Sequence, residues 1–148
     1  MSIRGDRQGM TSQQTDDLLA AAARLIAPAR QDADALDAEI WRRLADRGWR
    51  AANHALAAVL RSRDGDVPRT VRVRMNRLAA LAQSDPRLCA FRTDVQMVIA
   101  NLRVLAVERD ECSPTTIQRH LREVEDELLP LARRLCARRR GRRGDGSP

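Results

Sequence analysis

Histidine and cysteine are the residues of this chain that could hold a metal ion. The two histidines, His54 and His120, stand in neither an H-x-x-x-H nor an E-x-x-H arrangement, and no C-x-x-C pair occurs. Metal sites of helical bundles need such spacings, because ligands about one turn apart share a helix face. The sequence therefore predicts no metal site and no cofactor.

Cys112 is the strongest candidate for a nucleophile. It lies just before a predicted helix start, where the helix dipole could lower the pKa of a thiol. His120 is too far along the chain to act as its base, at about 12 Å for a helical path. No nucleophile elbow and no glycine-rich phosphate loop occurs, so the sequence predicts a protein that is not an enzyme.

The segment from Cys112 to Leu121 resembles the turn and recognition helix of bacterial helix-turn-helix regulators. A serine cap is followed by apolar residues at the anchoring positions, Ile117 and Leu121. The resemblance implies that polar residues before, between and after these two anchors read base edges in the major groove. These residues are Thr115, Thr116, Gln118, Arg119 and Arg122. The pattern departs from the family at the turn glycine, which is missing. An acidic run after Arg122 would repel phosphates.

The basic residues are all arginine, and their distribution is uneven. Residues 133–148 carry seven arginines and one aspartate, a net charge of +6, out of +7 for the whole chain. Residues 1–132 therefore carry only +1. The absence of lysine excludes chemistry that needs a lysine amine. It fits either GC-rich codon usage or a host-directed effector or viral accessory protein that avoids lysine modification.

The arginines of the C-terminal segment are expected to contact an anionic partner. Nucleic acid, an acidic protein surface and an anionic membrane surface all remain open, because each attracts clustered arginines. A terminus that only improves solubility is a further alternative. The candidate contact residues are Arg138, Arg139, Arg140, Arg142 and Arg143.

An all-α fold must position these residues. Trp41, Trp49 and Phe91 are the only aromatic residues, so leucine, valine, isoleucine and alanine must build the core. That composition favours close-packed helices over a β-sandwich. We expect a disordered leader at residues 1–14, a single helical bundle of about five helices at 15–136, and a disordered arginine-rich tail at 137–148.

Caps and breakers set the expected helix bounds. The first helix should start after Thr15 and end or kink at Pro28. The second should run from about 32 to 61, with a break at Gly48. The third is expected at 68–83, and two more should begin at Pro86 and Pro114, which suit a first helical position. Pro130 should kink the last helix.

The last two helices carry apolar stripes at alternating spacings of three and four, which predict a heptad-patterned C-terminal helical hairpin. The stripes are Leu88, Phe91, Val95, Val98, Leu102 and Leu105, then Ile117, Leu121, Val124, Leu128, Leu131 and Leu135. Heptad surface left over on either helix could join two copies. A protein partner or a homodimer is therefore expected.

The chain shows no secretory signal and no transmembrane segment, which predicts a cytoplasmic protein. Three widely spaced cysteines agree with a reducing compartment. The sequence as a whole favours a non-enzymatic accessory or regulatory protein that acts by protein–protein interaction, with a cationic tail for an anionic partner. The alternative is a nucleic-acid-binding regulator that uses residues 112–122 and the tail.

Overall fold

The computed structural model is an all-α helical bundle, which confirms the predicted fold class. It describes the backbone of residues 3–31, 38–107 and 114–145, and the side chains of 13–27, 39–106 and 114–137. Within those ranges every regular element is helical. The elements are α1 (Ile3–Gln31), α2 (Ala38–Asp64), α3 (Val71–Ser84), α4 (Arg87–Val107), α5 (Pro114–Glu123), the π-helical turn η1 (Val124–Leu128) and α6 (Leu129–Asp145).

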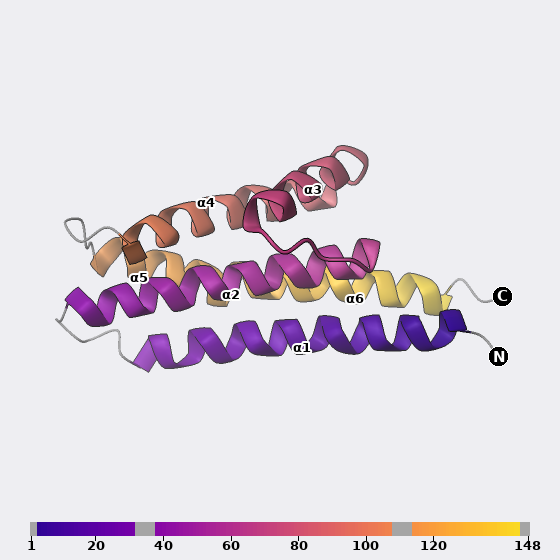
Figure 1. Cartoon of the computed structure of the whole chain (residues 1–148), viewed down its shortest axis with the longest axis horizontal. Coiled ribbons are helices and arrows are strands. Elements are labelled where there is room, and N and C mark those ends of the chain that lie inside the picture. Colours follow the sequence, from indigo (N-terminus) through magenta and orange to yellow (C-terminus); the bar gives the residue numbers. More distant parts are fainter. Residues whose placement is uncertain (1–2, 32–37, 108–113, 146–148) are drawn as a thin grey trace.

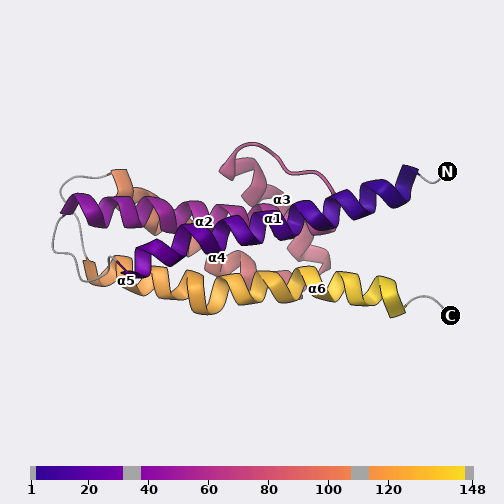
Figure 2. The ribbon, with the colours of Figure 1, turned by 90° about the horizontal axis from the view of Figure 1, so that it is seen from below.

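Helix α2 occupies the centre of the bundle. It packs against α1 on one side, α4 on the other and the continuous rod of α5, η1 and α6 behind it. Chain direction alternates from α1 to α2, from α2 to α4 and from α4 to the rod (Figures 1 and 2). The start of α1 and the end of α6 therefore lie at the same end of the bundle. The short helix α3 packs only on α4 and α2 among the described residues.

The burial of α2 follows from this central position. Residues 55–60 are all buried, so this stretch has no solvent-facing side. The predicted break at Gly48 is wrong, because α2 continues through it. A Cβ at Gly48 would lie 2.6 Å from Leu102 Cδ1 and 2.8 Å from Leu121 Cδ2. The glycine therefore allows α4 and α5 to approach α2 closely.

The predicted stripes of the last two helices point inward. Phe91, Val95 and Leu102 of α4 are fully buried, and so are Ile117 and Val124 of the following rod. The two helices are antiparallel, as expected (Figure 1). However, α4 packs more extensively on α2 than on its sequence neighbour α5.

Two capped turns frame α3 and lead into α4. Thr70 caps α3 by accepting a hydrogen bond from the Val73 amide at 3.3 Å. Asp85 was predicted to cap α4, and its Oδ1 accepts the Arg87 amide at 3.2 Å. Hydrogen bonds from Arg87, and then the charges of Arg63 and Arg87, hold the pKa of Asp85 below its usual value despite partial desolvation.

Pro130 was predicted to kink the last helix, and the π-helical turn η1 stands just before it. The Leu129 amide bonds to Val124 O rather than to the carbonyl four residues back. A proline ring clashes with the carbonyl four residues earlier, here that of Asp126. The wider π turn gives that carbonyl room, and α6 continues.

Helix bounds differ from the prediction at both termini. Helix α1 begins at Ile3 rather than after Thr15, and Thr15 is buried inside it. Its backbone also passes Pro28, where an end or kink was expected. The backbone of α6 continues to Asp145, into the segment expected to be a disordered tail. The division into leader, bundle and tail stays a prediction.

Candidate functional site

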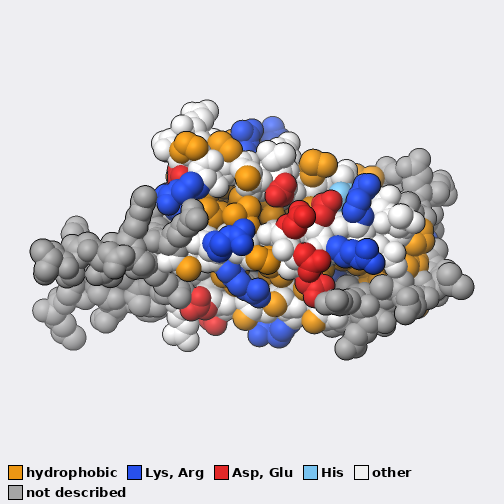
Figure 3. Space-filling model, turned by 180° about the vertical axis from the view of Figure 1, so that it is seen from behind, with side chains coloured by type: hydrophobic (Ala, Val, Ile, Leu, Met, Phe, Trp, Pro, Cys, Tyr) orange, Lys and Arg blue, Asp and Glu red, His pale blue; other side chains and the backbone are white. Residues whose placement is uncertain are grey.

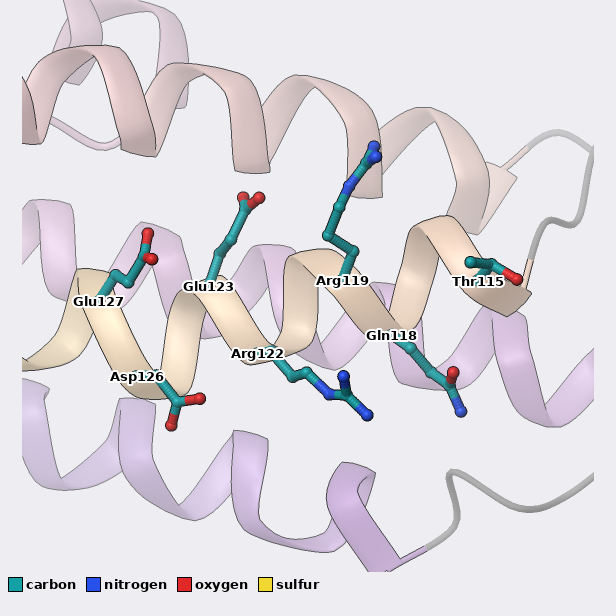
Figure 4. Close-up of a pocket in the computed structure, with 7 residues that line it drawn as sticks. All are labelled: Thr115, Gln118, Arg119, Arg122, Glu123, Asp126 and Glu127. Atoms are coloured by element: carbon teal, nitrogen blue, oxygen red, sulfur yellow. The ribbon is translucent and has the colours of Figure 1, made fainter.

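The outer face of α5 and η1 carries four of the side chains that the sequence singled out. They line an open hollow of about 360 Å³ on the outer side of this rod, and every lining residue comes from α5 or η1. Its lining residues, drawn in Figure 4, are Thr115, Gln118, Arg119, Arg122, Glu123, Asp126 and Glu127. Four of the five predicted base-reading residues therefore share one surface. The fifth, Thr116, is half-buried and does not line the hollow.

The hollow is divided by charge along the helix. Arg119 and Arg122 lie toward its N-terminal end, and the three carboxylates follow them. Arg119, Glu123 and Glu127 point toward α4, while Gln118, Arg122 and Asp126 point toward α1 (Figure 4). The sequence showed an acidic run after Arg122, but local spacing did not assign it to the same surface as the arginines.

Four of these charged side chains are exposed: Arg119, Arg122, Asp126 and Glu127. Within the described part of the chain, none of the four forms an ion pair. Figure 3 shows that acidic side chains gather in the middle of the rear face of the bundle, with arginines on both sides. The hollow thus offers two separated patches of opposite charge to a partner.

His120 fixes this face to α4 through a partly buried polar bridge. The histidine is only 1% exposed. Its Nε2 lies 3.2 Å from Asn101 Nδ2 of α4, and its Nδ1 lies 3.1 Å from Glu123 Oε2. With the amide donating to Nε2, the ring is the neutral tautomer that donates from Nδ1 to the carboxylate.

The same geometry decides what His120 can do chemically. A histidine beside a glutamate has the arrangement of a general base with its orienting carboxylate. Here both ring nitrogens already have partners and the ring has no open side, so no nitrogen faces a substrate. The bridge holds α4 and α5 in register. The sequence offered one signal for it, the three-residue spacing of His120 and Glu123.

Helix α4 adds an apolar strip beside this face. Its apolar members, Ala90, Met97, Ala100 and Val104, are all exposed on one side of the helix, with the polar Thr93 between Ala90 and Met97. Met97 is 53% exposed and Val104 49%. Asn101, which bonds to His120, stands four residues after Met97 and three before Val104. Residues at these spacings neighbour one another on a helix, so the outer stripe of α4 adjoins the charged hollow.

The remaining candidates do not form a site. His54 is half-buried, and its pKa is lowered by burial first, then by the charges of Arg74 and Arg50. Cys136 is buried and Cys89 is exposed, both as free thiols. Cys112 lies outside the described residues. The described side chains hold no cluster of three or more potential metal ligands.

The arginines of the C-terminal segment cannot be placed against this face. The backbone of residues 138–143 belongs to α6, but the side chains of Arg138, Arg139, Arg140, Arg142 and Arg143 lie outside the described ones. Among the described residues, no helix is both long and apolar enough to cross a membrane.

No protein-family model, curated protein or solved structure matches this chain. The charged hollow and its bridge to α4 are therefore the starting point for a functional argument.

Proposed function

We propose that this protein is a non-enzymatic accessory or regulatory protein that acts by binding another protein through the outer face of α5 and η1. The observation that carries the proposal is that one hollow holds two exposed arginines and two exposed carboxylates, unpaired within the described chain, beside an apolar strip. An apolar area next to complementary charge is the usual composition of a protein interface. The cationic C-terminal segment would then contact an anionic partner.

The carboxylates disfavour DNA at this face. A phosphate approaching Arg119 or Arg122 would also meet Glu123, Asp126 and Glu127, whose charges repel it. The position of α5 adds to this, since α4 and α1 flank it on both sides (Figure 4). A recognition helix must enter a groove about 12 Å wide, so it has to project beyond the helices next to it.

A nucleic-acid-binding regulator remains the second candidate, because Thr115, Gln118, Arg119 and Arg122 do share one face. DNA retention across a range of salt, measured for the full chain and for residues 1–136, separates the two. The protein-binding proposal expects any retention to depend on the removed arginines, with a steep salt dependence. It also expects no base sequence to be selected from a random pool. Selection of a defined sequence that is lost in Gln118→Ala/Arg119→Ala would overturn it.

The protein-binding face is tested by charge reversal. Arg119→Glu/Arg122→Glu should abolish co-purification of a protein partner from the native host. Arg69→Glu/Arg72→Glu is the matched control, because it makes the same charge change at exposed residues at the start of α3, away from the hollow and from the cationic C-terminal segment. Equal loss with both pairs would show that only overall charge matters.

A further inference from the structure

We infer that the protein occupying this face is a second copy of the same chain, which forms a two-fold dimer through α5, η1 and the outer stripe of α4. The inference rests on the proposed function, because it takes the face as a protein-binding surface and identifies its occupant. Three observations carry it. The first is the order of charges along α5 and η1. The second is that Arg119, Arg122, Asp126 and Glu127 form no ion pair within the described chain. The third is the exposed apolar strip beside them.

The order of charges is self-complementary. Two-fold symmetry places the same surface of both copies face to face, so every contact occurs twice. If the axis crosses the rod near Glu123 and Val124, the two rods run antiparallel. Arg119 of one copy then lies within about one residue, roughly 1.5 Å along the axis, of the level of Glu127 in the other. Arg122 has the same relation to Asp126.

The same rotation places α4 on α4. The two-fold axis lies in the plane of the interface and is perpendicular to the rods. Rotation about this axis reverses the direction of the rods, but it keeps α4 on the same side of them in both copies. The exposed side chains of Met97 and Val104 therefore meet the same strip of the other copy. Burial of this strip supplies attraction without direction. Exposed ion pairs contribute little affinity by themselves. The charges therefore mainly set the register in which the two copies align.

The size of the face predicts a reversible dimer. Helix α4 has 21 residues, a length of about 31 Å. Two neighbouring helices, each about 9 Å wide, form a strip about 18 Å across. Over the length of α4 this is a face of about 500 Å² per copy. Stable complexes typically bury about 800 Å² per partner. The dimer is therefore expected to dissociate in the micromolar range and to weaken as salt is added.

Charge reversal in separate copies tests the arrangement directly. Sedimentation of the full chain between about 5 and 500 μM should show a monomer–dimer equilibrium. Arg119→Glu/Arg122→Glu and Asp126→Arg/Glu127→Arg should each weaken it at least about 10-fold, because like charges then face one another. An equimolar mixture of the two variants should recover a dimer, since opposite charges meet again across the interface. Arg69→Glu/Arg72→Glu, at exposed residues at the start of α3, should leave the equilibrium unchanged.

Each other result counts against the inference. A wild-type chain that stays monomeric throughout that range overturns it. A dimer that persists in both reversed variants places the contact elsewhere, and failure of the folded variants to associate on mixing removes the charge pairing. Circular dichroism confirms that each variant is folded. A monomeric wild type whose separate protein partner is still lost in Arg119→Glu/Arg122→Glu would retain the proposed function and exclude only self-association.

Discussion

Replacement of Gly48 by alanine tests the closest helix contact in the bundle. A methyl group at this position would lie 2.6 Å from Leu102 Cδ1 and 2.8 Å from Leu121 Cδ2, whereas unstrained carbon atoms approach to about 3.5–4.0 Å. Both leucines are buried, so they must change rotamer or move their helices by about 1 Å. Overpacking of this kind costs about 1–3 kcal/mol.

The helix itself favours the substitution. Alanine stabilises a helix interior by about 1 kcal/mol relative to glycine. With a clash of about 1 Å on two sides, we expect the steric cost to exceed this gain. Gly48→Ala should therefore lower the free energy of unfolding, by up to about 2 kcal/mol. Denaturant unfolding, followed by circular dichroism and by the fluorescence of Trp41 and Trp49, measures the change.

A double-mutant cycle separates the clash from other effects. Leu102→Ala removes the nearer methyl group and should destabilise by about 2–5 kcal/mol on its own. In that background Gly48→Ala should cost less than in the wild type, with a coupling of about 1 kcal/mol or more. Stabilisation by Gly48→Ala in the wild type would refute the close approach of α4 and α5 to α2.

Three further predictions concern polar groups. Asn101→Ala should lower the free energy of unfolding by about 1–3 kcal/mol, because it leaves a buried nitrogen of His120 without a partner. Gln96→Ala, at an exposed residue of the same helix, is the control and should change stability little. Thermal unfolding compares the two variants. Asp85→Ala should cost about 1 kcal/mol through loss of the cap of α4. The lowered pKa of His54 means that the unfolded chain binds more protons, so stability measured by denaturant titration should fall as pH drops below 6.5. The lowered pKa of Asp85 adds a second loss below 3.8, absent in Asp85→Asn.

Buried residues were predicted most accurately in helices that bury only one face. The stripe on α4 follows from spacing alone, since any helix with that pattern buries the same face. Residues 55–60 of α2 follow a different rule, because neighbours on several sides bury them all. Helix contacts that involve distant segments decide that environment. The role of Gly48 depends on the same contacts, and the glycine was therefore misread as a break.

The candidate face was predicted in part for the same reason. Arg119 and Arg122 were identified through the resemblance of residues 112–121 to a helix-turn-helix segment, and the predicted helix start at Pro114 is confirmed. The link from His120 to Asn101 joins residues on different helices, and no local spacing reveals it. The start of α1 was missed because capping residues near Thr15 suggested a boundary, whereas Thr15 packs against neighbouring helices inside a longer helix.

The position of Glu123 connects the fold to the face. Its carboxylate bonds to buried His120, while it also lines the hollow between Arg119 and Glu127. A partner charge that draws Glu123 away would leave Nδ1 of the histidine unpaired in the core, at a cost of about 1–3 kcal/mol. The bridge therefore keeps the carboxylate of Glu123 in place. Exposed Asp126 and Glu127 are left to contact the charges of a partner. For this reason Asp126 and Glu127, and not Glu123, are the carboxylates whose reversal reports on binding without disturbing the fold.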